Sequence, residues 1–106
     1  MLNDVHSIVV MVRNCSSLSE ELERLQSISG KVQPLKLILD VKTRWNSTYY
    51  MLKRFDELGM YVTQLEESFD FPDEEEMNQI RIIINLQRNF ILHLLKQVHK
   101  VQAHVL

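Results

Sequence analysis

The sequence has little of the residues that break helices or build covalent frameworks. Its 106 residues include two glycines, two prolines and one cysteine. The single cysteine, Cys15, excludes an internal disulfide and a zinc site built on a Cys-x-x-Cys pair, which is typical of a reducing compartment. The scarcity of glycine and proline and the absence of an internal repeat favour long helices with short connectors. The 45% apolar content predicts a folded core.

Long hydrophobic runs and a leader segment are also missing. The uninterrupted apolar run from Ile8 to Val12 is far shorter than the roughly 20 residues of a membrane span. The start, Met1 to Asp4, carries no basic leader. We therefore expect a soluble intracellular protein that does not contact a membrane.

Charge is small in total but unevenly distributed. The net charge is −2, yet the segment 31–54 carries six Lys or Arg against Asp40 alone. The segment 56–76 carries nine acids and no Lys or Arg, and the segment 77–106 carries Lys and Arg without an acid. The basic segment suits contact with phosphates, whereas the acidic block argues against a chain that coats nucleic acid along its whole length.

Helical periodicity dominates the first third of the chain. Val5, Ile8, Val9 and Val12 share one helical face, and the polar run 14–17 then ends the pattern. The string 17–20, Ser-Leu-Ser-Glu, has the spacing of a capping box at the start of a second helix. Gly30 suits a left-handed residue that closes this helix, and Pro34 opposes its continuation.

The rest of the chain predicts one extended segment and two further helices. The segment from Leu35 to Val41 follows a proline and contains the apolar string 37–39, Leu-Ile-Leu, which favours a short strand or an extended linker. Asn46 or Ser47 suits the cap of a third helix. Residues 68–72 have the composition of a loop, and the acids 73–76 suit the positive end of a fourth helix. Two apolar stripes then follow, Met51, Leu52, Phe55, Leu58, Val62 and Leu65 on the third helix and Met77, Ile80, Ile84, Ile91, Leu94, Val98 and Val101 on the fourth. The stripe of the fourth helix is broad, because Ile83, Leu86, Phe90 and Leu95 widen it. We therefore expect this helix to be central or partnered.

The string from Asp40 to Leu52, Asp-Val-Lys-Thr-Arg-Trp-Asn-Ser-Thr-Tyr-Tyr-Met-Leu, is followed by two basic residues. It resembles the hAT transposase superfamily, including the zinc-finger BED-type proteins descended from it. The similarity is convincing over residues 1–65 and loose over 66–106. It implies that residues 1–106 are a single partial domain, a piece of a ribonuclease-H-like domain and its helical insertion, with a mainly α fold of about four helices and at most one short strand.

The resemblance also implies a nuclear protein that binds DNA and derives from a transposable element. Trp45 takes the position of the family tryptophan that holds an unstacked base near the transferring strand end. Arg44, Lys42, Lys53 and Arg54 are the accompanying candidates for DNA binding. Stacking of a base on an aromatic ring contributes roughly 1–3 kcal/mol, which is enough to help hold a flipped nucleotide.

Each of these residues also has a purely structural interpretation. A tryptophan beside a helix start is commonly a core anchor, and Arg44 could pair with Asp40 or with the acidic block. Lys42, Lys53 and Arg54 could belong to a solvated face. These alternatives stay open at the level of sequence.

Catalytic chemistry is not expected of this chain. The reaction of the family needs three carboxylates that hold two divalent metals, and none of them falls within this length. Asp40 follows an apolar strand-like segment, but its place just before the motif is not a catalytic one. The four histidines have no metal-binding spacing. We expect no catalytic residue, no metal, no cofactor and no enzyme activity.

Two classes of function therefore remain. The first is a DNA-handling fragment of a transposase-like protein. The second is a helical interaction module or domesticated remnant, in which the fourth helix binds another chain, binds a missing part of the same protein or self-associates.

Overall fold

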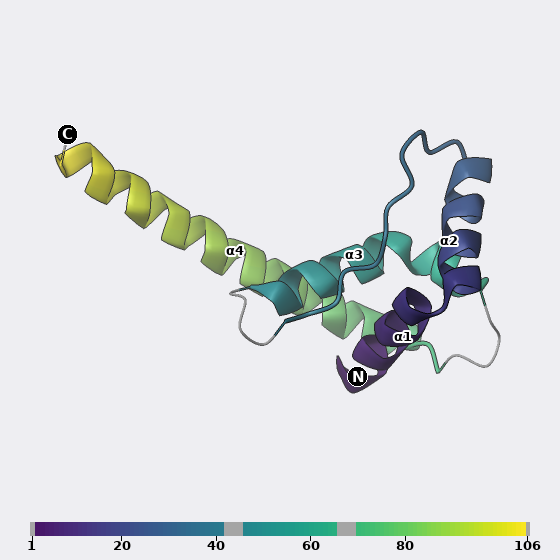
Figure 1. Ribbon diagram of the computed structural model, residues 1–106. Coiled ribbons are helices and arrows are strands. Elements are labelled where there is room, and N and C mark those ends of the chain that lie inside the picture. Colours follow the sequence, from purple (N-terminus) through teal and green to yellow (C-terminus); the bar gives the residue numbers. More distant parts are fainter. Residues whose placement is uncertain (1, 42–45, 66–69, 106) are drawn as a thin grey trace.

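The computed structural model describes residues 2–41, 46–65 and 70–105, which form four helices (Figure 1). These are α1 (Leu2–Asn14), α2 (Ser16–Ile28), α3 (Ser47–Val62) and α4 (Glu74–Val105). No strand is present within those three ranges. The predicted mainly α fold of four helices is confirmed.

The first two helices meet at a tight corner at Cys15. α1 buries Val5, Ile8, Val9 and Val12, as the periodicity predicts. The predicted capping box of α2 is wrong: Cys15 occupies the N-cap position, and no side chain makes the capping hydrogen bond. The hydroxyl of Ser19 instead donates to the carbonyl of Val12 across the corner, at 2.7 Å. The bond made by Ser19 ties α1 to α2 at the corner, while the hydroxyl of Ser17 lies 3.2 Å from Sγ of Cys15.

The end of α2 follows the sequence prediction. Gly30 adopts a φ of +99°, the left-handed region that favours glycine. The amide of Gly30 donates to the carbonyl of Ser27, and the amide of Lys31 donates to that of Gln26. This pair of bonds is a Schellman motif, which satisfies carbonyls that the last turn leaves open.

α3 is the central helix of the core. It packs against α1, α2 and α4, whereas α4 packs against α3 alone among the described helices. Of the two alternatives expected for the last helix, the central position is wrong, because α3 fills that place, and the partnered helix stays a prediction. Of the predicted α3 stripe, all but Leu65 lie on the helix and are buried; Leu65 lies beyond its end and is partly buried. The buried apolar residues are Val5, Ile8, Val9, Val12, Leu22, Leu37, Tyr49, Met51, Leu52, Phe55, Leu58, Tyr61, Val62, Met77, Ile80 and Ile84.

The segment between α2 and α3 is extended but pairs with no strand in the described chain. Leu37 is buried in the core, which fixes one face of the segment. Gln26, fully buried on α2, accepts from the amide of Leu35 and donates to its carbonyl, both at 2.8 Å. A side-chain amide thus supplies the two hydrogen bonds that a neighbouring strand would supply.

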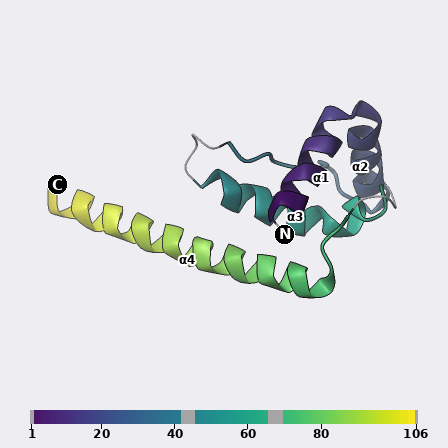
Figure 2. The ribbon, with the colours of Figure 1, turned by 90° about the horizontal axis from the view of Figure 1, so that it is seen from below.

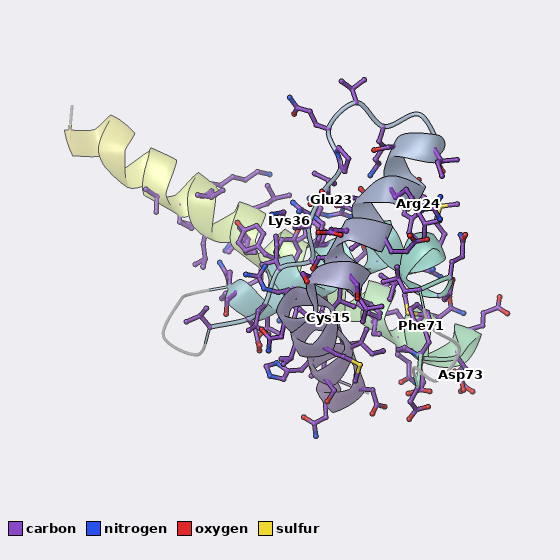
Figure 3. All side chains as sticks on the ribbon, turned by 45° about the vertical axis from the view of Figure 1, so that its right-hand side comes forward. Cys15, Glu23, Arg24, Lys36, Phe71 and Asp73 are labelled. Carbon is purple, nitrogen blue, oxygen red and sulfur yellow. The ribbon has the colours of Figure 1, made fainter. Side chains whose placement is uncertain are left out.

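Two ion pairs lie on the outside of α2, one within the helix and one between the helix and the extended segment. Arg24 donates to both carboxylate oxygens of Glu21, and this hydrogen bonding lowers the pKa of Glu21 below its ordinary value. Lys36 of the extended segment lies 3.9 Å from Glu23 (Figure 3). All four side chains are substantially exposed, so these pairs contribute little to stability.

α4 starts with a capping box that is formed by Asp73 and Glu76. The amide of Glu76 donates to the Asp73 carboxylate at 2.8 Å, and the amide of Asp73 donates to Glu76 at 3.4 Å. The three glutamates of the first turn lie at the positive end of the helix dipole, as the sequence predicts. Just before this turn, Phe71 stacks on Phe55 of α3, with ring centroids 5.2 Å apart. Asp73 therefore caps the start of α4, and Phe71 anchors that start to the core (Figure 3).

α4 is twice as long as the helix on which it packs. It has 32 residues against 16 in α3, so at about 1.5 Å per residue it exceeds α3 by about 24 Å. Figures 1 and 2 show its C-terminal half extending away from the other helices. In the described part of the chain, no helix is both long and apolar enough to cross a membrane.

Candidate nucleic-acid interface

The motif segment is closed by the first residue of α3. The hydroxyl of Ser47 donates to the carbonyl of Val41 at 2.8 Å and accepts from the amide of Val41 at 3.0 Å. Ser47 is buried, so water does not compete for these bonds. Lys42, Arg44 and Trp45 lie between these two residues, outside the described part of the chain. The two ends of the motif segment are therefore held against each other.

Asn46, at the N-cap position of α3, is the only described residue other than glycine with a positive φ, 61°. Its side chain makes no capping hydrogen bond, and Ser47 is engaged with Val41. Asn46 thus takes the predicted N-cap position, but the prediction that Asn46 or Ser47 caps the helix through its side chain is wrong. The amides of the first turn consequently have no cap from these two side chains, and such amides are where a helix attracts an anion.

Two arginines hold the extended segment that leads into the motif. Arg13 of α1 donates to the carbonyl of Leu37, and Arg54 of α3 donates to the carbonyl of Lys36, both at 2.7 Å. Arg54 also lies 3.8 Å from Glu57. Arg54 is a predicted DNA contact; in the structure its guanidinium holds the backbone of the extended segment at Lys36, and its contact with DNA stays a prediction.

Lys53 lies on the outer side of α3, beside a groove that α3 forms with α4. Its side chain is exposed, and Arg88 of α4 lines the same groove. Arg81 is there as well, but it is paired with Asp56 at 3.0 Å. Lys53 of α3 therefore shares a surface with Arg88 of α4, a basic residue from another helix.

An exposed aromatic residue follows the motif on the first turns of α3. Tyr50 is 47% exposed, whereas the preceding Tyr49 is buried. The two rings meet edge to face, with centroids 5.1 Å apart, so Tyr49 supports the position of Tyr50. The signal that separates them is position on the helix, since Tyr49 alone faces the core.

Asp40 pairs with a histidine of α1. Its carboxylate oxygen lies 2.8 Å from Nδ1 of His6. Among the described residues, no three His, Cys, Asp or Glu side chains are grouped closely enough to hold a metal ion. The contact made by Asp40 therefore ties the extended segment to α1.

Together these features define an all-helical arrangement in which Val41 and Ser47, the two residues that bracket the motif segment, are hydrogen-bonded to each other at the start of the central helix. The family model of the ZBED1 RNase-like helical domain matches residues 1–86. The chain belongs to this family. The expected relationship to BED-type proteins of hAT origin is thereby confirmed at the level of the family.

One curated relative is a putative transcriptional regulator, tpeD, from the fungus Talaromyces stipitatus. It is 28% identical to this chain over 109 residues, which cover 97% of the chain. The chain spans only 12% of the length of that relative. No solved structure matches the chain.

Proposed function

We propose that this chain is the DNA-handling helical part of a nuclear, hAT-derived protein that regulates transcription or descends from a transposase. The observation that carries the proposal is the closure of the motif segment by the two hydrogen bonds between Ser47 and Val41. Family membership and the tpeD relative support the ancestry and the nuclear setting.

In this proposal Trp45 stacks on an unpaired base, and the cations around it contact phosphates. A loop whose two ends are fixed loses less entropy on binding than a free one, so the closure favours recognition. Arg44 offers five donors in a plane, which suits a phosphate. Tyr50 extends the aromatic surface by one further ring.

The chain acts in this proposal without catalysing strand transfer. Cutting and joining of DNA by two metal ions needs a set of carboxylates. We place that set, where a longer relative has one, outside this chain. The helical part would then contribute binding and the positioning of a base.

The direct test uses Trp45, because it is the only tryptophan in the sequence. Its fluorescence should be quenched by single-stranded DNA, and the quenching should weaken as salt rises, since phosphate contacts release counterions. Arg44→Gln and Lys42→Gln should each reduce the affinity and the slope of its salt dependence. Arg24→Gln, on the exposed side of α2 and outside the basic segment, serves as the matched control and should leave both unchanged.

Absence of quenching at low salt by DNA of any sequence would contradict the proposal. So would an equal loss of affinity in the Arg24 control, because DNA binding would then follow net charge and not the motif. A spectral shift without salt dependence would also contradict the assignment of phosphate contacts.

A second candidate function is a helical interaction module, and one specific observation favours it. The C-terminal half of α4 leaves large apolar side chains exposed, among them Phe90, Leu95 and Val98, which are 58%, 49% and 51% exposed. Such a surface commonly marks a contact with another protein.

A further inference from the structure

A groove lies between α3 and α4, on the half of α3 that follows the motif segment. The two helices pack on each other and run antiparallel (Figures 1 and 2), so the first half of α4 lies along α3. Lys53 of α3 and Arg88 of α4 line this groove, and both side chains are exposed. Two residues that are distant in the sequence therefore place their positive charges on one surface.

Two carboxylates also line the groove, and each has an arginine partner. Asp56 accepts from Arg81 at 3.0 Å, and Glu57 lies 3.8 Å from Arg54. The charge of each acid is therefore offset within the protein.

Lys53 and Arg88 have no such partner, since neither forms an ion pair with a described residue. Arg88 instead donates to the side-chain oxygen of Asn85 at 2.8 Å, and Asn85 lines the same groove. This bond holds the guanidinium beside the groove and leaves its positive charge and further N–H donors for a ligand. The groove thus presents two cations to an anion from outside.

The groove continues the line of the motif along α3. Tyr50 and Lys53 are three residues apart, which places them on one side of the helix, with Tyr50 nearer the motif. Tyr50 is 47% exposed. From Ser47 to Lys53 the helix rises about 9 Å at about 1.5 Å per residue, and two or three stacked nucleotides at about 3.4 Å each cover a similar length. An exposed ring followed by cations is the arrangement that single-stranded nucleic acid uses, because its bases stack and its phosphates pair with cations.

From these observations we propose that Lys53 and Arg88 together hold a phosphate of a single DNA strand that runs from the motif past Tyr50 into the groove. This inference rests on the proposed DNA binding and adds the path of the strand; Lys53 is a candidate from the sequence, whereas Arg88 and the groove come from the structure. The planar donors of Arg88 suit two phosphate oxygens, and Lys53 supplies a point charge. An acidic peptide would also meet these cations, but it would leave Tyr50 without a base.

The test measures binding of the whole chain to a labelled oligothymidylate of about 12 nucleotides, a length within the range of single-strand binding sites. Fluorescence anisotropy of the DNA label reports the affinity at several salt concentrations and does not depend on Trp45. Arg88→Gln and Lys53→Gln should each weaken binding about three- to tenfold and lower the slope of log affinity against log salt by about 0.7.

Two further variants keep the test specific to the groove. Glu57→Gln removes a carboxylate from the same groove and should strengthen binding, so two changes at one surface should act in opposite directions. Arg24→Gln, on the outside of α2, removes one positive charge elsewhere and should leave the affinity and the slope unchanged. All four side chains are exposed, so the unfolding midpoint of each variant should match that of the unchanged chain.

The outcomes separate this inference from the proposed function. If the DNA binds and quenches Trp45 while Arg88→Gln behaves like Arg24→Gln, the strand does not enter the groove and the inference is wrong. Polyglutamate of the same length that binds as tightly, with the same dependence on Arg88, would also overturn it. Binding that persists in Trp45→Ala and depends on Arg88 would support the groove and contradict stacking at Trp45. Absence of DNA binding by the unchanged chain would overturn both.

Discussion

The buried hydroxyl of Ser47 is hydrogen-bonded to both backbone groups of Val41, six residues earlier in the chain. A serine at a helix start would ordinarily cap the helix, and here it closes the segment that precedes the helix. The extended segment is itself fixed by Gln26, Arg13 and Arg54. The extended segment that leads into the motif is therefore tied to α1, α2 and α3.

Ser47→Ala tests this closure. It leaves the amide and carbonyl of Val41 without their partner, which should lower the free energy of unfolding by about 1–3 kcal/mol. Quenching of Trp45 fluorescence by single-stranded DNA should weaken in the same variant. Denaturation in urea and a DNA titration measure the two effects. Ser7→Ala, on the exposed side of α1, is the control and should change stability by less than about 0.5 kcal/mol. Equal losses in both variants would show that the bonds to Val41 are not the cause.

Phe55 lies in the core, whereas Phe90 lies on the exposed part of α4, so the two residues should respond differently to substitution. Phe55 is fully buried and stacks on Phe71, so Phe55→Ala should lower the free energy of unfolding by about 3–5 kcal/mol. Phe90 is 58% exposed, so Phe90→Ala should cost less than about 1 kcal/mol. The midpoints of thermal unfolding provide the comparison. A large loss in the Phe90 variant would mean that this half of α4 is buried in solution.

Much of this fold could be predicted from the spacing of apolar residues. The stripes on α1 and α3 and the closing role of Gly30 follow from rules that act within a few residues. Asn46 takes the predicted N-cap position of α3, but the predicted side-chain caps are missing at the starts of both α2 and α3. Ser17 lies inside α2, which begins at Ser16, and the hydroxyl of Ser47 bonds to the carbonyl of Val41, which the folded chain brings close. Local sequence rules do not include such partners.

The difference between local rules and contacts made only in the folded chain also applies to the candidate site. The motif itself was visible in the sequence, but the residues that position it were not, because Gln26 and Arg13 come from other helices. The groove that joins Lys53 and Arg88 also depends on how α3 and α4 pack. Lys42, Arg44 and Trp45 lie outside the described residues, so their roles stay predictions.

The purified chain should neither cut nor join DNA in the presence of magnesium or manganese. The physical reason is that no set of carboxylates for two metals is expected within this length. A gel assay with labelled substrate at several metal concentrations measures this directly. Metal-dependent cleavage that Asp40→Ala abolishes would contradict the prediction and make Asp40 a metal ligand. His6→Ala is the control for Asp40, since it removes the partner at 2.8 Å and keeps the carboxylate.

Trp45→Ala decides between the two interpretations of the motif tryptophan. Loss of a fully buried tryptophan typically costs about 3–5 kcal/mol, whereas loss of an exposed one costs little. We expect an intermediate loss of about 1–2 kcal/mol, because one face of the ring should pack on the start of α3 and leave the other face for a base.

The matched measurement on the unchanged chain is quenching of Trp45 by acrylamide and by single-stranded DNA. A half-accessible indole should be quenched by both, and the DNA effect should decline with salt because Arg44 and Lys42 add phosphate contacts. Emission shielded from acrylamide, together with collapse of the Trp45→Ala fold, would assign Trp45 to the core. An unchanged unfolding midpoint with free quenching would instead place the ring wholly in solvent, where stacking on a base would be its remaining role. The unfolding midpoint of Trp45→Ala and the two quenching constants therefore show whether Trp45 is a core anchor, a half-packed ring or a free ring.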